Sequence, residues 1–215
     1  MKERPILFAG PMVRAILEGR KTQTRRLIRP QPEMIMDGES LPDGTVYCGW
    51  EPVLPSWSKW PYQSGMELWV KETWATDIPG CPNGISYRAD HIGPKGGRPA
   101  NPIKWRPSIF MPKSASRVRL EIVRVRAELL QSISEDDAIA EGVEGWDVHY
   151  YDDAQDYWRN YLMTREQERN GSQHFTDPIK SYKSLWDSFN REKLPWKSNP
   201  WVWVIEFKRK DVSLQ

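Results

Sequence analysis

Apolar residues recur along this chain with the two periods that are typical of helices and of strands. Met12, Ala15 and Ile16 follow the i, i+3, i+4 spacing that places side chains on one face of a helix. Gly19 is a typical residue at a helix C-terminus, because glycine tolerates the left-handed conformation found there. The pattern therefore predicts a helix over residues 11–18.

A second short helix is expected over residues 134–141, within the segment SISEDDAIAEGV. Ser134 can cap its N-terminus, acidic residues fill its first turn, and Gly142 can end it. Glu141 falls in the last turn, where the helix dipole disfavours a carboxylate. That placement is a hint that Glu141 has a role other than stability. Two further helices are predicted over residues 154–170 and 178–190.

Alternating or continuous apolar runs predict short strands separated by turns rich in proline and glycine. In the longest run, residues 116–130, the apolar residues occupy even-numbered positions up to Ile122 and odd-numbered positions from Val123. This shift of the alternation by one residue is the signature of a β-bulge. The run at residues 199–210 is apolar on both faces, which is typical of a strand covered on both sides, and we assign Trp201 and Trp203 to the core. The predicted strands cover residues 4–8, 22–28, 65–75, 84–90, 116–130 and 199–210.

These elements predict one α+β domain over residues 1–215, interrupted by two insertions at about 28–64 and 144–176. The sequence has only two cysteines, its first residues do not resemble a signal peptide, and no apolar run is long enough to span a bilayer. We therefore expect a cytoplasmic protein without membrane contact. The two cysteines and three scattered histidines lack the spacing of a zinc site, so we expect no metal and no cofactor. The oligomeric state is left open.

Charge is distributed in blocks although the net charge is only +2. Residues 1–30 carry eight Lys/Arg and two Glu, and residues 104–126 carry seven Lys/Arg and one Glu. Residues 134–156 carry nine Asp/Glu and no Lys/Arg. Such blocks are usually solvated faces that pair with one another. Alternatively, the two basic segments meet around a cleft and attract phosphate.

Three segments, in order, resemble the ASCH-domain family of the PUA-like superfamily: ILEGRKTQTRR, SISEDDAIAEGV and NPWVWVIEFK. The intermediate pieces LWVKETW, SYRAD and SIFMPKSASRVRLEIVRVRAELL look like the longer members found in phages and prophages. The resemblance implies a small, mostly antiparallel PUA-like β-barrel flanked by helices. It also implies a nucleoside or RNA as the binding partner.

The family includes a small bacterial amidohydrolase that acts on N(4)-acetylcytidine. Its proposed catalytic lysine, threonine and glutamate match Lys21, Thr24 and Glu141 here. A threonine hydroxyl needs a base to become a nucleophile, and a lysine is such a base only when its pKa is lowered. Because side chains alternate along a strand, Lys21 and Thr24 can meet only if the chain turns or bulges between them.

Five further residues are candidates for substrate binding. Arg20, Arg25 and Arg26 can raise the local potential and hold an electron-rich ligand, although Arg25 and Arg26 can equally pair with the acidic block at 134–156. Glu72 is either a second carboxylate of the cleft or a solvated strand residue. Trp74 either stacks on a base or packs in the core.

The leading expectation is a protein that binds a nucleoside or RNA and hydrolyses the amide of an N(4)-acylated cytidine. A fold can bind without catalysing. The alternatives are therefore a non-catalytic RNA- or DNA-binding module and a phage accessory protein that acts through a protein partner. A nucleic-acid module predicts binding that weakens steeply with salt, whereas a partner protein predicts an exposed apolar patch.

Overall fold

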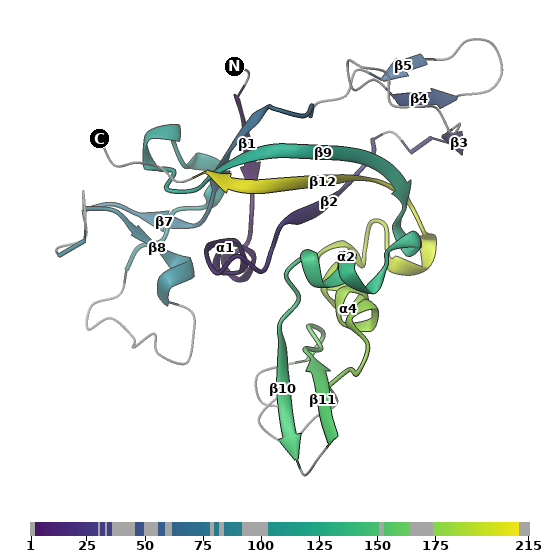
Figure 1. Ribbon diagram of the computed structural model, residues 1–215. Helices are drawn as coiled ribbons and strands as arrows, with labels where there is room; N and C mark the ends of the chain where they lie inside the picture. The colour runs from purple at the N-terminus through teal and green to yellow at the C-terminus, as the bar shows by residue number, and fades with distance from the viewer. Residues whose placement is uncertain are drawn as a thin grey trace. The chain divides into compact units, whose positions relative to one another are not determined.

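The computed structural model describes residues 3–29, 31–32, 34–35, 46–49, 56–58, 62–77, 80–81, 84–91, 103–150, 153–163 and 174–210 (Figure 1). The chain combines helices with strands, as the α+β class predicted. It divides into two compact units, each assembled from separate segments. Unit 1 comprises residues 1–20, 62–124 and 207–215, and unit 2 comprises residues 21–61 and 125–206.

A five-stranded sheet carries most of the regular structure, in the order β1-β6-β9-β12-β2. β1 pairs with β6 in parallel, whereas β6 pairs with β9, and β12 with β2, in the antiparallel sense. The mostly antiparallel sheet is thus as predicted, and the described strands form an open order without barrel closure. The bounds are β1 Glu3–Leu7, β2 Gln23–Leu27, β6 Glu67–Lys71, β9 Arg119–Leu129 and β12 Trp201–Lys210.

Three smaller sheets lie outside this order. One has the order β3-β4-β5 and falls within the predicted insertion at 28–64, and the others are the pairs β7-β8 and β10-β11. Their bounds are β3 Met34–Ile35, β4 Val46–Gly49, β5 Ser56–Ser58, β7 Trp74–Ala75, β8 Ser86–Tyr87, β10 Gly145–Tyr150 and β11 Asp153–Trp158. The strand predicted over 84–90 is therefore shorter than expected, because a 3-10 helix takes over at Arg88–His91.

Three of the four predicted helices are present. They are α1 (Gly10–Leu17), α2 (Glu135–Ala140) and α4 (Pro178–Asn190). The Ser134 side chain caps α2 by accepting a hydrogen bond from the Asp137 N–H at 3.2 Å, as the sequence predicted. Within unit 2, α2 packs against α4.

The helix predicted over residues 154–170 is wrong for residues 154–163, because 153–158 form strand β11 paired with β10 and residues 159–163 are not helical. The helix was expected because Tyr157, Trp158, Tyr161 and Leu162 follow the spacing of one helix face. Long-range pairing decides the outcome instead. Trp158 lies opposite Gly145, and a Cβ on that glycine would lie 2.7 Å from the Trp158 ring. The ring therefore occupies the space that a side chain at 145 would need. Residues 164–170 lie outside the described residues.

The long strand β9 changes its exposure pattern where its sequence changes parity. Ile122 is buried, whereas Val123 is 51% exposed and Arg124 is exposed as well. The alternation therefore breaks at the expected place, and the bulge itself stays a prediction.

In β12, Val202, Trp203, Val204 and Ile205 are consecutively buried, which confirms a strand covered on both faces. Trp201 is only partly buried, because it opens the strand.

Candidate functional site

Lys21 belongs to the two residues that lead into β2, because this strand begins only at Gln23. The Thr22 N–H donates to the Ala140 carbonyl at 2.9 Å, which fixes this segment to the last turn of α2. Lys21 therefore does not follow the alternation of the strand that contains Thr24. The objection that positions 21 and 24 face opposite sides of a regular strand does not apply.

Glu141 stands at the C-terminal cap of α2, where its N–H donates to the Asp137 carbonyl at 2.9 Å. Gly142 follows with a φ of 82°, in the left-handed region that favours glycine. The chain therefore leaves the helix at Gly142. This sharp exit keeps Glu141 in the interior of unit 2, where it is 3% exposed.

The Lys21 ammonium is held by Glu141 through two hydrogen bonds. Its Nζ donates to Glu141 Oε2 at 2.7 Å and to the Glu141 carbonyl oxygen at 2.8 Å, and the Lys21 side chain has no exposed surface. Burial lowers the pKa of Lys21 below its usual value of 10.5, since an ammonium loses its hydration. Glu141 opposes this effect, whereas the positive charges of Arg26 and Arg25 add to it.

Arg25 is the centre of an ion-pair cluster on the other side of Glu141. Its guanidinium reaches Glu141 Oε1 at 3.2 Å, Glu128 Oε1 at 2.6 Å and Asp137 Oδ2 at 2.7 Å, and its side chain is fully buried. Burial disfavours the charge, but Glu141, followed by Tyr182 and Glu128, outweighs burial and raises the pKa of Arg25. Arg25 thus pairs with the acidic block, as one of the two alternatives predicted.

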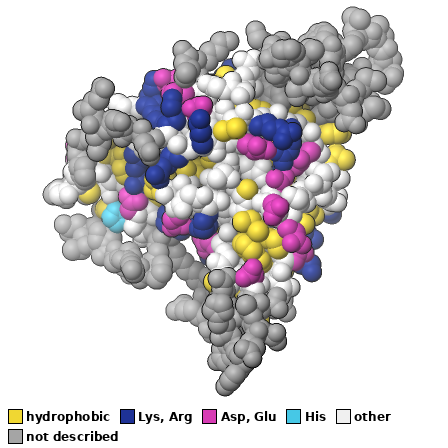
Figure 2. Space-filling model, in the orientation of Figure 1, with side chains coloured by type: hydrophobic (Ala, Val, Ile, Leu, Met, Phe, Trp, Pro, Cys, Tyr) yellow, Lys and Arg dark blue, Asp and Glu magenta, His cyan; other side chains and the backbone are white. Residues whose placement is uncertain are grey.

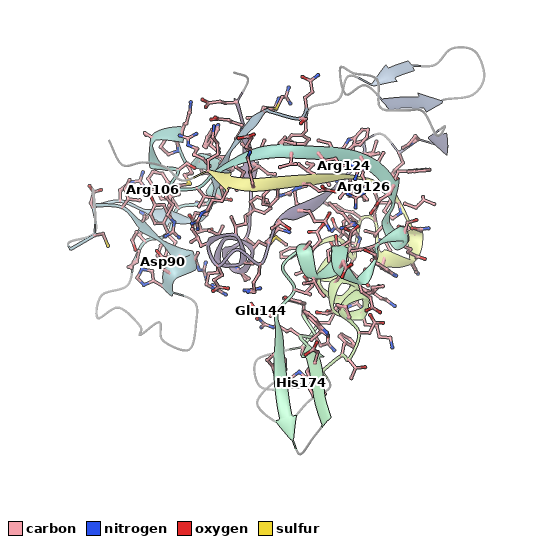
Figure 3. All side chains as sticks on the ribbon, viewed as in Figure 1. Asp90, Arg106, Arg124, Arg126, Glu144 and His174 are labelled. Carbon is pink, nitrogen blue, oxygen red and sulfur yellow. The ribbon has the colours of Figure 1, made fainter. Side chains whose placement is uncertain are left out.

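Arg126, labelled in Figure 3, extends this cluster from β9. It contacts Glu128 Oε2 at 3.1 Å, Asp137 Oδ2 at 2.6 Å and the carboxylate of Glu206. Asp137 is therefore shared by two arginines from the two basic segments of the sequence. On the face shown in Figure 2, most Lys and Arg side chains have acidic side chains beside them.

The other candidate site residues of the segment ILEGRKTQTRR, namely Thr24, Arg26 and Arg20, differ in burial. Thr24 is 4% exposed and its backbone pairs with Ile205 of β12. Its direct contact with Lys21 stays a prediction. Arg26 is partly buried in β2, whereas Arg20 is exposed and pairs with Glu18, two residues earlier. Arg20 therefore adds less to the potential at a buried lysine than Arg25 and Arg26.

Glu72 and Trp74 belong to unit 1, whereas Lys21, Thr24 and Glu141 belong to unit 2. Glu72 is 1% exposed and accepts from Arg117 Nε at 2.9 Å, while Arg117 also pairs with Asp90 at 2.8 Å. Glu72 is therefore not a solvated strand residue. Trp74 is 5% exposed and packs with Met111 and Ala115, as the core alternative predicted. Its Nε1–H is buried and has no hydrogen-bond partner among the residues that the structure describes.

Sequence reasoning did not single out Asp137, Glu128 or Gln23 as parts of the site. Asp137 and Glu141 are four residues apart and so share one helix face, a signal that was available. Gln23 donates from Nε2 to the Asp137 carbonyl at 2.8 Å, and its buried Oε1 has no hydrogen-bond partner within the described part of the chain. Glu128 carried no such signal, because only the pairing of distant segments brings it to Arg25.

No protein-family model matches the chain, and no curated protein or solved structure matches it either. In the part of the chain that the structure describes, no helix has the length and apolar character that crossing a membrane requires. Among the same residues, no cluster of three or more His, Cys, Asp or Glu is arranged to hold a metal ion.

Proposed function

We propose that this chain is an ASCH-type protein with a PUA-like barrel core that binds a nucleoside or RNA and hydrolyses the amide of an N(4)-acylated cytidine. The observation that carries the proposal is the buried Lys21–Glu141 pair. A lysine without exposed surface and with a lowered pKa is the form of this residue that acts as a base. Groups with perturbed pKa values are concentrated at functional sites.

In the proposed reaction, Lys21 takes the proton of the Thr24 hydroxyl as the threonine oxygen attacks the acyl carbonyl. The C–N bond breaks, the exocyclic nitrogen of cytosine receives the proton, and the acyl group stays on Thr24 as an ester. Water then hydrolyses this ester, with Lys21 again as the base. The hydrogen bond of 2.7 Å between Lys21 and Glu141 gives a route for a proton between these two groups.

The test is to incubate the purified protein with N(4)-acetylcytidine and follow the release of cytidine. Lys21→Met keeps the length of the side chain without the base, Thr24→Ser keeps a hydroxyl, and Thr24→Ala removes it. We expect Lys21→Met and Thr24→Ala to lower kcat by about 10²–10⁴-fold, which is the typical rate contribution of general acid–base catalysis. Thr22→Ala is the matched control, since Thr22 is exposed and the variant keeps the backbone N–H that donates to Ala140. Turnover by Lys21→Met at the wild-type rate would refute the mechanism.

The second candidate is a non-catalytic binding module. It is favoured by one observation, namely that two oxygens of Glu141 already hold the Lys21 ammonium, as in a structural ion pair. This alternative predicts that the wild type releases no cytidine from any acylated cytidine but still binds nucleoside or RNA. It also predicts that Lys21→Met changes the free energy of unfolding and leaves affinity unchanged.

A further inference from the structure

A cavity in unit 2 lies at the base of the β10–β11 hairpin. It has a volume of about 250 Å³ and is lined by Glu144, Trp146, Arg159, Asn160, Met163 and His174. None of these residues belongs to the Lys21 site. Pockets for drug-sized ligands measure about 300–1,000 Å³, so this cavity suits one small ring system.

One wall of the cavity is aromatic. The rings of Trp146 and His174 meet edge to face with centroids 4.5 Å apart, and Tyr157, the cross-strand neighbour of Trp146, lies 6.4 Å from His174. Trp146 is nevertheless 38% exposed, and His174 is exposed as well. An exposed indole beside a cavity is a surface on which a planar ligand can stack.

The rest of the lining is polar and offers both donors and acceptors. Arg159 Nη1 contacts Glu144 Oε2 at 2.6 Å, which presents a guanidinium and a carboxylate side by side (Glu144 and His174 are labelled in Figure 3). Asn160 accepts from the Leu162 N–H through Oδ1 at 3.1 Å. Among the described residues, its amide nitrogen donates to no partner. A heteroaromatic ring with adjacent donors and acceptors matches this combination.

The cavity lies close to the proposed catalytic cluster, because Glu144 follows Glu141 by three residues. A fully extended chain spans at most about 3.6 Å per residue, so their Cα atoms are no more than about 11 Å apart. Stacked bases of one strand rise about 3.4 Å per step, and splayed bases of single-stranded RNA lie farther apart. A neighbouring nucleotide of the same strand can therefore reach the cavity while another base lies at Lys21.

We propose that this cavity binds a second, unpaired nucleobase, so that the substrate is a segment of single-stranded RNA rather than a free nucleoside. The inference rests on the proposed function for the identity of the first base. The base in the cavity stacks on Trp146 and exchanges hydrogen bonds with Asn160 and with the Arg159–Glu144 pair. Contacts outside the reacting base then supply binding energy for orienting it.

The experiment uses a fluorescein-labelled six-nucleotide RNA, the same RNA with one N(4)-acetylcytidine, and N(4)-acetylcytidine itself. Stacking of a base on an aromatic side chain is worth roughly 5- to 150-fold in affinity, so we expect Trp146→Ala to raise the Kd for the unmodified RNA by that factor. Trp146→Phe keeps a ring and should recover most of the affinity. Phe189→Ala is the matched control, because Phe189 is an exposed aromatic residue of α4 in the same unit and does not line the cavity.

Turnover separates this inference from the proposed function. We expect Trp146→Ala to lower kcat/KM for the acetylated RNA and to leave that for N(4)-acetylcytidine unchanged. If the wild type hydrolyses neither substrate but its RNA affinity depends on Trp146, the catalytic proposal fails and the cavity stands. If Trp146→Ala binds RNA as the wild type does, or the wild type binds no RNA at low salt, the cavity proposal is overturned. Trp146→Ala can also perturb the hairpin, so a photocrosslink from 4-thiouridine RNA to the wild type gives an independent test. A crosslink mapped to Trp146 or His174 supports the cavity proposal, and a crosslink mapped only elsewhere overturns it.

Discussion

Lys21 and Glu141, 120 residues apart in the chain, are joined through both the carboxylate and the main-chain carbonyl of the glutamate. The second contact is available because Glu141 ends α2, where carbonyl groups have no partner in the next helical turn. A glutamate at the C-terminus of a helix, unfavourable for the helix dipole, thereby gains a role in holding a buried ammonium. The same contact makes Lys21 sensitive to any change in the last turn of α2.

The pH dependence of the proposed reaction follows from the lowered pKa of Lys21. Neutral Lys21 is the active base, so kcat/KM should rise with pH and level off once pH exceeds the pKa of Lys21. Burial lowers this pKa, and Glu141 opposes the shift, so the midpoint should lie below the usual 10.5. A pH–rate profile on an N(4)-acylated cytidine measures it, with Lys21→Arg expected to lose this limb. A midpoint at or above 10.5 contradicts the assignment.

Removing the charge of Arg25 should destabilise the protein strongly. Arg25→Met leaves Glu128, Asp137 and Glu141 without their shared guanidinium, and breaking a buried pair in this way costs about 3–5 kcal/mol. Arg25→Lys should recover only part of the loss, since lysine lacks the planar fork that reaches several carboxylates. Denaturant unfolding measures the change. Arg29→Met, at an exposed position just after β2, is the control and should be nearly neutral.

Asp137 should make the folded state sensitive to acid. Burial raises its pKa, but hydrogen bonding from Gln23 and the charges of Arg25 and Arg126 outweigh this and lower the pKa below 3.8. The unfolded chain therefore binds the proton more readily. The stabilisation is present above about pH 3.8 and is lost as pH falls through the lower, folded value.

Asp137→Asn should remove this part of the acid dependence, which thermal unfolding between pH 2 and pH 7 would reveal as a flatter profile. Asp136→Asn is the matched control, because the neighbouring Asp136 is exposed. Equal flattening in both variants would show that the acid dependence arises from general charge repulsion rather than from the ion-pair cluster.

Gly145→Ala should destabilise the β10–β11 hairpin. The new Cβ would lie 2.7 Å from the Trp158 ring, and relief requires movement of the ring or of the strand. Overpacking of this kind costs about 1–3 kcal/mol. In a Trp158→Val background the same substitution should cost clearly less, which a double-mutant cycle measures. An equal cost in both backgrounds would place the effect in the backbone instead.

The sequence was most informative where structure is local. The cap at Ser134 and the stop at Gly142 depend on neighbouring residues, so helix α2 was predictable. The helix α4 was predictable because its apolar residues Ile179, Tyr182, Leu185, Trp186 and Phe189 recur at helical spacing. The hairpin at residues 145–158 was not predictable, because the apolar residues from Tyr157 to Leu162 follow a helical period. The pairing of Tyr157 and Trp158 with residues 145–146 is not encoded in local spacing.

The candidate site was predictable only in part for the same reason. The family motif pointed to Lys21 and Glu141, and their contact is present in the structure. The convergence of Arg25, Arg126, Glu128 and Asp137 required strands from distant segments to come together. A basic block and an acidic block predict that charges pair, but they do not predict which side chains share one carboxylate.

The pairing of β2 with β12 also affects how unit 2 folds. Gln31 holds the backbone of Trp201 across 170 residues of chain, because its side-chain Nε2 donates to the Trp201 carbonyl and its Oε1 accepts from the Trp201 N–H. Contacts of such long range slow folding, because the entropy of closing a long loop is lost before the contact forms. During synthesis, Arg25 leaves the ribosome long before Val204, its cross-strand partner in β12, exists. The pairing of β2 with β12 therefore has to wait until nearly all of the segments of this unit have been translated.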